Sequence, residues 1–429
     1  MFRRGFKRGE VALFSLATLL FPVFPSASAA DSADWPQWRG PRSEGVWRGV
    51  KLPAKLSPDL VETRWKAALG GGYAGIAVAE GRVLTMDLQK EPRAAERVLC
   101  FGREDGKLLW KHEYPVEYGD LDHPSGPRAT PTVRDGRVYT LGTMGHLFCL
   151  ELASGKVIFS HELGNLPGSR LPTWGHAASP LMIEELMVVQ AGAGPPGTVM
   201  AFDRKTGAER WRSLGDRAGY STPIVRRRGG RDELVVWTPD NVHGLNPLSG
   251  GSLWKHPFKT SQYDVAIISP VAEGGQVLVS GYWDGSEAIR IDASPPDGAA
   301  LRSVWKSREL SCLMATPLFR DGYLYALDKK DGLLCLEWET GKVLWSDGHR
   351  MTPKDRNPQA SMVWCDGARA AVLNAEGQLI LARLGPEGYQ EEGRAPIIGP
   401  TWAHPAFAGQ EVFARSDTEL VCVRIRGGE

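Results

Sequence analysis

The chain has 429 residues, of which 51 are Lys or Arg, 50 are Asp or Glu and 42% are hydrophobic. This near-neutral balance, with only short basic clusters, gives no surface of the kind that binds nucleic acid, and the hydrophobic content excludes a disordered chain. The 50 glycines and 30 prolines follow no collagen-like period and indicate many tight turns.

The first thirty residues have the three parts of an export signal. Residues 3–8 carry four basic side chains, residues 11–24 form an apolar run, and residues 26–30 are small. The run of about 14 residues is too short to cross a bilayer comfortably. We therefore predict that residues 1–30 are a cleavable signal peptide and that the mature chain is periplasmic or secreted. A retained anchor is the alternative, and Sec and twin-arginine export both remain open.

The rest of the chain repeats one pattern: Ala-Thr/Ser-Pro, an acidic-Gly turn, a hydrophobic run, and Thr-Gly-x-x-x-Trp. The fullest copies are ATPLFRDGYLYALDKKDGLLCLEWETGKVLW at 315–345 and ATPTVRDGRVYTLGTMGHLFCLELASGKVIF at 129–159. The closing aromatic recurs every 40 to 52 residues, at Trp110, Phe159, Trp211, Trp254, Trp305 and Trp345. Such a period is typical of propellers and arrays.

Each copy contains four short apolar runs separated by turns. In the copy at 315–345 we expect strands at 317–319, 323–328, 333–338 and 342–346. Four short strands make one propeller blade. The copies begin near Gly75, Ala129, Ala178, Ser221, Ile268, Ala315, Ala360 and Ala403.

The eighth copy ends at about Arg426, after only three strands, whereas the segment 62–66 around Trp65 looks like a terminal strand without a blade. We therefore predict an all-β fold, an eight-bladed β-propeller in which the N-terminal strand completes the last blade and removes an exposed edge. In this interpretation residues 31–61 are a lead-in segment and residues 62–429 are the propeller. Seven blades is the alternative.

The repeat also explains its aromatic residues and its cysteines. One large ring at the end of each copy would pack between neighbouring blades. Four of the six cysteines occupy the same repeat position, so they should lie in different blades: Cys100, Cys149, Cys335 and Cys422. We expect mostly free, packed thiols rather than a disulfide framework.

The stretch VMAFDRKTGAERW at 199–211 resembles the pyrroloquinoline quinone (PQQ)-type repeat, and the resemblance covers about residues 65 to 426. The segment DWPQWRGP at 34–41 is similar to the lead-in of a group of exported bacterial PQQ-like propellers. The resemblance implies a propeller fold and two functional classes: quinoprotein dehydrogenases and non-catalytic propellers such as the outer-membrane-assembly scaffold.

A quinoprotein dehydrogenase is expected to hold PQQ on the axis with Ca²⁺ or a lanthanide, a carboxylate base and often an adjacent cysteine pair. The chain has no adjacent cysteines, and no cluster of oxygen ligands appears in the sequence. We therefore assign no catalytic residue and no metal ligand. We expect no cofactor, and PQQ with Ca²⁺ only if the chain is a dehydrogenase.

Residues just before each innermost strand should lie near the axis at one mouth of the propeller, where aromatic and polar groups in a concavity are typical of a ligand site. The loop PTWGH at 172–176 reappears as PTWAH at 400–404. The candidate binding surface consists of Arg128, Trp174, His176, Tyr220, Asp264, Gln359, Trp402 and His404. Satisfied polar residues in turns between blades are the alternative interpretation.

We therefore predict an exported, non-catalytic and monomeric binding or scaffolding propeller with a protein or cell-envelope partner. A PQQ-dependent alcohol or sugar dehydrogenase is the first alternative. A carbohydrate-binding propeller is the second, because loop tryptophans stack well on pyranose faces.

Overall fold

The computed structural model describes residues 1, 33–123, 125–292 and 300–427. The predicted signal peptide, residues 1–30, lies outside this part of the chain except for Met1. Within the described residues we find no helix with the length and apolar character needed to cross a membrane.

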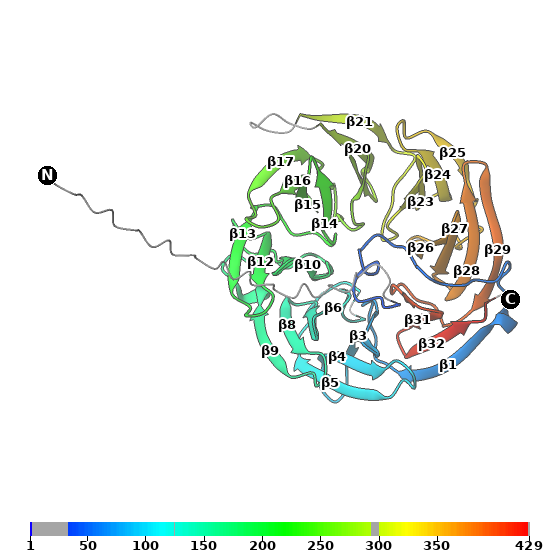
Figure 1. The fold of residues 1–429 in the computed structure, drawn as a ribbon, viewed down its shortest axis with the longest axis horizontal. Coiled ribbons are helices and arrows are strands. Elements are labelled where there is room, and N and C mark those ends of the chain that lie inside the picture. The colour runs from blue at the N-terminus through cyan, green and yellow to red at the C-terminus, as the bar shows by residue number, and fades with distance from the viewer. Residues whose placement is uncertain (2–32, 124, 293–299, 428–429) are drawn as a thin grey trace.

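Eight four-stranded antiparallel sheets surround one axis, as an eight-bladed β-propeller (Figure 1). We number them blades 1 to 8 in chain order and describe each from its innermost strand outward. Blades 1 to 4 consist of β2 (Ala77–Ala79), β3 (Arg82–Gln89), β4 (Ala95–Gly102) and β5 (Leu108–Pro115); β6 (Thr132–Arg134), β7 (Arg137–Leu141), β8 (His146–Glu151) and β9 (Val157–Glu162); β10 (Leu181–Ile183), β11 (Leu186–Gln190), β12 (Val199–Asp203) and β13 (Glu209–Ser213); β14 (Ile224–Arg228), β15 (Arg231–Trp237), β16 (Asn241–Leu245) and β17 (Ser252–Pro257).

Blades 5 to 8 follow the same order. They consist of β18 (Val271–Glu273), β19 (Gln276–Gly281), β20 (Gly285–Ile291) and β21 (Leu301–Ser307); β22 (Leu318–Arg320), β23 (Tyr323–Asp328), β24 (Gly332–Glu337) and β25 (Val343–Ser346); β26 (Ala360–Asp366), β27 (Arg369–Asn374), β28 (Gln378–Gly385) and β29 (Gly388–Pro396); β30 (Ala406–Ala408), β31 (Glu411–Arg415), β32 (Glu419–Ile425) and β1 (Val61–Ala68). In the described part of the chain, two 3₁₀ turns accompany the strands, η2 (Pro58–Leu60) and η3 (Leu163–Asn165).

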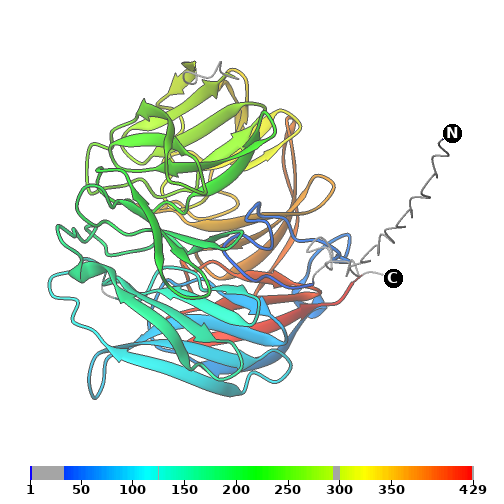
Figure 2. The ribbon, with the colours of Figure 1, turned by 60° about the vertical axis from the view of Figure 1, so that its left-hand side comes forward.

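The N-terminal strand closes the ring. Strand β1 pairs antiparallel with β32, from Val61 opposite Ile425 to Ala68 opposite Glu419. Figure 2 shows the blue β1 beside the red strands of the last blade. The eighth blade therefore has four strands, as predicted, and the seven-blade alternative is wrong.

The acidic-Gly dipeptides form the turn between the two inner strands of a blade. Asp135 and Gly136 have φ values of 50° and 68°, and Asp321 and Gly322 have 50° and 84°. A two-residue hairpin of type I′ needs positive φ at both central positions, which Asp and Gly accept at low cost. This requirement explains why the dipeptide recurs at this point of the repeat.

In five of the eight blades the closing aromatic packs on the turn glycine of the next blade, within the described residues. A Cβ atom on Gly155 would lie 2.5 Å from the ring of Trp110, and one on Gly341 would lie 2.5 Å from the ring of Trp305. The indole N–H of Trp110 also donates to the carbonyl oxygen of Leu152 at 2.9 Å. The glycine therefore supplies both the positive φ of its own turn and the flat surface for the neighbouring ring. The predicted packing between blades is confirmed.

The recurrent cysteines face these rings from the same sheet. Cys100 lies opposite Trp110 in the β4–β5 register, and Cys335 lies opposite Trp345. Blades 3 and 4 have a still smaller residue there, Ala201 and Gly244. The position takes small residues because the large ring fills the shared face. All six cysteines are free, as expected.

We predict that Trp305→Ala lowers the free energy of unfolding by about 3–5 kcal/mol, because it empties the space above Gly341 and leaves the Trp338 carbonyl without its indole donor. Chemical denaturation followed by circular dichroism measures the change. Leu248→Ala is the control, since that side chain is 57% exposed, and should stay within about 0.5 kcal/mol. Equal effects of the two variants would contradict this account.

We also predict that the native protein reacts very slowly with a thiol reagent at pH 8. Burial raises the pKa of Cys149 and Cys335 to about 11 and of the other four thiols to about 12, so little thiolate is present. Titration in strong denaturant should release six thiols, whereas four or fewer would reveal a disulfide.

Candidate functional site

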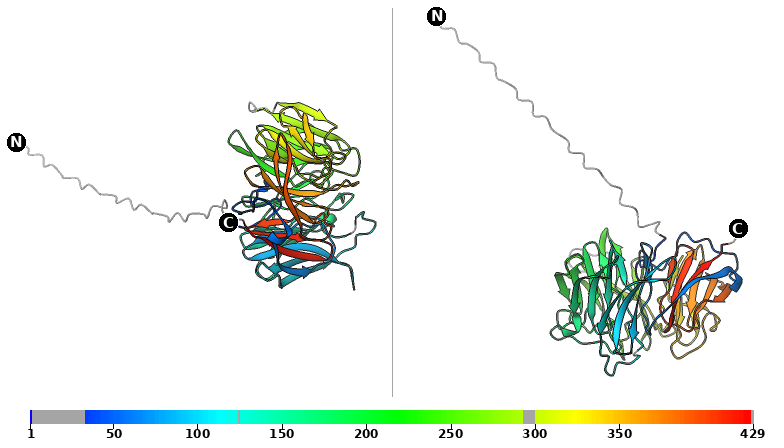
Figure 3. Two further views of the ribbon diagram at one scale, coloured as in Figure 1. Left: turned by 90° about the vertical axis from the view of Figure 1, so that its right-hand side faces the viewer. Right: turned by 90° about the horizontal axis from the view of Figure 1, so that it is seen from below.

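The lead-in closes one end of the propeller axis. Trp35 exchanges two backbone hydrogen bonds with Val78 of β2, both at 2.8 Å. The indole of Trp47 donates to Gly409 at 2.8 Å, and that of Trp38 donates to Ser269 Oγ at 3.1 Å. These partners belong to blades 1, 8 and 5, so the segment crosses the axis, and Figure 3 shows it along one face of the disk.

The opposite end of the axis is open and forms a cavity of about 340 Å³, which we call the cup. Seven of its twenty lining residues occupy one repeat position, the residue directly before the Ala-Thr-Pro motif that leads into each innermost strand. Blades 2 to 8 contribute Arg128, Ala177, Tyr220, Ile267, Met314, Gln359 and Trp402. Tyr73 represents blade 1, and Trp38 of the lead-in lies at the closed end.

A belt of hydrogen bonds below this ring holds the blades at a fixed distance from the axis. The N–H of Thr130 donates to Ser179 Oγ at 3.0 Å, and the N–H of Ser179 donates to Thr222 Oγ1 at 2.9 Å. The N–H of Ser269 donates to Thr316 Oγ1 at 3.3 Å. These hydroxyls are the Thr or Ser of the repeated motif, which thus supplies an acceptor to a neighbouring blade at three of the junctions.

Aromatic rings continue around the mouth of the cup. Tyr73 stacks on Trp402 with ring centroids 5.9 Å apart, and His123 lies 6.0 Å from Trp402 and 6.1 Å from Trp174. On its other side Trp174 stacks on Tyr263 at 6.1 Å. Tyr282 and Trp283 extend the arc into blade 5.

Two polar side chains of the cup, Arg128 and Gln359, differ in how far the protein satisfies their hydrogen bonds. Arg128 donates to the backbone carbonyl oxygens of Gly126, Asp122 and His123, so its guanidinium is occupied by the protein itself. Gln359 is only 2% exposed and lies in the wall, and its Oε1 has no hydrogen-bond partner among the described residues. Its amide nitrogen faces the Trp402 carbonyl at 3.4 Å, which fixes the amide orientation because a carbonyl accepts only from N–H.

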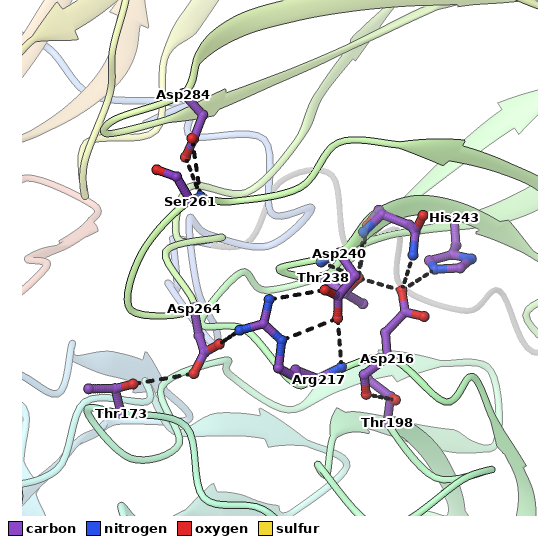
Figure 4. Close-up of polar contacts among 11 residues, drawn as sticks. Thr173, Thr198, Asp216, Arg217, Thr238, Asp240, His243, Ser261, Asp264 and Asp284 are labelled. Carbon is purple, nitrogen blue, oxygen red and sulfur yellow. Dashed lines mark hydrogen bonds and ion pairs between the residues drawn. The ribbon is translucent and has the colours of Figure 1, made fainter.

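The rim is held by the polar network of Figure 4. Arg217 pairs with Asp240 at 3.0 Å and also with Asp264, which accepts from Thr173 Oγ1 at 3.3 Å. The Tyr220 hydroxyl accepts from the N–H of Trp174 at 3.0 Å and donates to the Tyr263 carbonyl at 3.3 Å. The loops that carry Trp174 and Tyr263 are therefore tied to each other.

The backbone at this rim is itself strained. His123, Tyr263 and Asp264 have φ values of 54°, 52° and 58°, which side-chain-bearing residues adopt only when their surroundings impose them. Tyr263 is also 52% exposed.

A second cluster in the network is centred on Asp216, the residue directly before Arg217. Asp216 accepts hydrogen bonds from His243 Nε2 at 2.7 Å, Thr238 Oγ1 at 2.7 Å and Asn241 Nδ2 at 2.8 Å. Burial opposes ionisation of this carboxyl, but the three donors outweigh burial and hold its pKa well below the usual range.

The structure places six of the eight predicted residues in the cup wall. They are Arg128, Trp174, Tyr220, Gln359, Trp402 and His404. Asp264 lies at the rim and does not line the cavity. His176 is 2% exposed and lies in the interior, where burial lowers its pKa to about 4. The two PTW-x-H loops are thus not equivalent, because Trp174 precedes β10 by seven residues and Trp402 precedes β30 by four.

Sequence reasoning missed several cup residues. Met314 and Ile267 occupy the same repeat position as Arg128 and could have been found by it. Tyr263, Trp283 and Arg356 lie in loops whose paths the repeat does not specify. Trp38 comes from the lead-in, which has no counterpart in the repeat.

The cup does not fit a PQQ–metal site. Asp122 is the one carboxylate among the lining residues, and no group of three or more His, Cys, Asp or Glu side chains suited to a metal ion occurs in the described part of the chain. A Ca²⁺ ion takes about six to eight oxygen ligands. The lining residues therefore offer stacking faces and amides but no ligand set for a hard cation.

Comparison with known proteins gives one family. Residues 94–347 match the PQQ_2 family model, described as outer membrane protein assembly factor BamB. The chain is similar to the BamB proteins of Moranella endobia, 22% identical over 254 residues and 56% of this chain, and Yersinia pestis, 33% identical over 72 residues and 16% of this chain. The matches span 61% and 18% of the lengths of those two proteins.

Solved structures share the fold at low identity. BamB from Moraxella catarrhalis has a TM-score of 0.60 and 16% identity, with 86% of this chain and 99% of that chain covered. Quinohemoprotein alcohol dehydrogenase from Comamonas testosteroni has a TM-score of 0.66 and 12% identity, with 94% of this chain and 82% of that chain covered. A europium-containing methanol dehydrogenase has a TM-score of 0.66 and 10% identity, with 92% of this chain and 99% of that chain covered. These likenesses establish the fold alone.

We predict that Asp216→Asn destabilises the protein by about 1–3 kcal/mol at pH 7, because the carboxylate that three donors share loses its charge. Since the folded-state pKa lies below the unfolded value of about 3.9, the stabilisation is fully present above that value and is lost progressively as pH falls from it through the folded-state pKa. Thermal melts should show the gap between the two proteins narrowing steadily as pH falls below about 4. A gap that stays constant with pH would contradict this assignment.

Proposed function

Because the chain belongs to the PQQ_2 family, we propose that it is an exported, non-catalytic propeller that binds a protein or another component of the cell envelope and holds it in place. The relatives with recognisable sequence similarity carry the name outer membrane protein assembly factor, so we infer a role in an assembly of this kind. This function would place the mature chain in the periplasm or outside the cell.

The cup is the observation that carries the proposal. It is concave, aromatic and open on one face, and its rim is preorganised by the network around Asp264 and by the Tyr220 hydroxyl. Preorganised rims lower the ordering cost of binding. The bias toward stacking faces supports binding, because flat aromatic side chains hold a ligand through contact area.

A quinoprotein dehydrogenase is the second candidate, favoured by the likeness in fold to two dehydrogenases and by the position of the cup on the axis. The single carboxylate among the lining residues counts against it. Adding PQQ and Ca²⁺ to the purified protein separates the two functions. A quinone absorbance shift with dye reduction by alcohols or sugars would establish the dehydrogenase and overturn our proposal.

We predict that the partner docks on the open mouth. A photo-crosslinking residue at position 263, on the rim, should capture one defined envelope component in cells that export the full chain. The same residue at position 248, equally exposed in a turn at the closed end of the propeller, is the matched control. Crosslinking at 263 should fall about tenfold when Trp174→Ala and Trp402→Ala are combined, which corresponds to about 1.4 kcal/mol. Equal capture at both positions, or none at 263, would refute docking at the mouth.

A further inference from the structure

We propose that the cup is a saccharide site that takes one or two pyranose units at the end of a neutral glycan. The proposal rests on the proposed function, since it names the ligand class of the same cup. Four properties of the cavity carry it: a closed floor, exposed aromatic faces, an unsatisfied buried amide and a small net charge.

The closed floor restricts how a ligand enters. Trp38 fills the axis from the lead-in side, where its ring meets that of His404 at 4.1 Å and its indole N–H reaches Ser269. A polymer therefore cannot thread through the propeller and can enter only by an end. The volume of about 340 Å³ lies at the small end of ligand sites, which range over about 300–1,000 Å³, and suits a short terminal segment.

The wall offers flat apolar faces on several sides. Trp402 and Tyr73 present stacked rings on one side, and Tyr263 with Trp283 lies on the side of blade 5. A pyranose ring has a face of C–H groups that packs on such rings and an edge of hydroxyl groups that must be hydrogen-bonded. An amphipathic wall of this kind matches both parts of the ring.

The buried amide requires a ligand with hydrogen-bond donors. Gln359 is 2% exposed, its nitrogen is directed to the Trp402 carbonyl, and its Oε1 lacks a partner among the described residues. A buried acceptor without a hydrogen bond costs free energy, and a hydroxyl donor of a bound ligand would recover it. Asn357, two residues before it, places a second amide in the wall. A purely apolar ligand would leave Gln359 Oε1 without a donor.

The charges of the cup favour a neutral ligand over an ionic one. Arg128 already donates to three backbone carbonyl oxygens, so its guanidinium is not free to pair with a carboxylate or phosphate group. Counted with Arg128, the ionic side chains among the described lining residues are two cations and one anion, Arg356 being the second cation and Asp122 the anion, so the net charge is small. Burial lowers the pKa of His404 to about 3, and this ring therefore adds no charge at neutral pH.

The test uses the exported, mature-length protein on a glycan array, followed by calorimetric titration with cellobiose, N,N′-diacetylchitobiose and maltose. Inorganic phosphate and PQQ serve as anionic probes. We expect at least one neutral disaccharide to bind and to change tryptophan fluorescence, with its affinity reduced about tenfold by Trp402→Ala and by Gln359→Leu. Neither anion should compete.

Two further variants keep the test decisive. Tyr263→Ala alters an exposed rim residue and should weaken binding even if a change at Trp402 disturbs folding. Leu109→Ala alters a 51% exposed side chain on the outer strand β5 and should leave the affinity unchanged. Circular dichroism and thermal melts confirm that each variant is folded.

The outcomes separate this inference from the function on which it rests. If no glycan binds on the array or at about 10 mM disaccharide, while position 263 still crosslinks a protein, the saccharide site is wrong and the scaffold stands. If PQQ binds and turns over, both are wrong. If a glycan binds equally well to the Trp402→Ala and Tyr263→Ala variants, the site lies outside the cup and the inference fails.

Discussion

The architecture depends on one contact that is repeated around the ring: a flat aromatic side chain lying on a glycine of the next blade. Any Cβ at Gly106, Gly155 or Gly250 would lie 2.5 Å from the ring above it, so the spacing between blades is set by a residue without a side chain. The small residue opposite each ring, as Cys100 is to Trp110, keeps the shared face open from within the sheet. Together with the belt of hydroxyls near the axis, these contacts fix the distance of each blade from its neighbours, and that distance determines the width of the cup.

Much of this could be predicted from the sequence because it recurs. The expected strand at 323–328 coincides with β23, those at 317–319 and 333–338 are shifted by one residue from β22 and β24, and that at 342–346 starts one residue before β25. The closing strand was recognisable because the last copy lacks one. The repeat position before each innermost strand also led to Arg128, Tyr220, Gln359 and Trp402, since equivalent positions in equivalent blades must converge on the axis.

The parts that could not be predicted are those that the repeat does not determine. His176 and Trp174 share one loop, yet one side chain is buried and the other faces the cup, because the loop is longer before β10 than its counterpart before β30. Asp264 was placed in the cavity by analogy, whereas its carboxylate is engaged with Arg217 and Thr173. Tyr263 and Trp283 depend on loop conformation, including two residues with positive φ, for which the pattern of apolar residues carries no signal.

The cup is divided between the two ends of the chain. Its floor, Trp38, is made first during synthesis, and its wall is completed by Trp402 of the last blade, on a sheet that β1 must also join. A nascent chain, or one truncated at either end, thus lacks the floor or the completed wall of the cup. Because a ligand stabilises only the state that binds it, a ligand in the cup would stabilise correctly closed propellers relative to incompletely closed ones. A ligand in the cup would then mark molecules in which the propeller has closed. The lead-in, which supplies the floor, would link the start of the chain to the closure of the last blade.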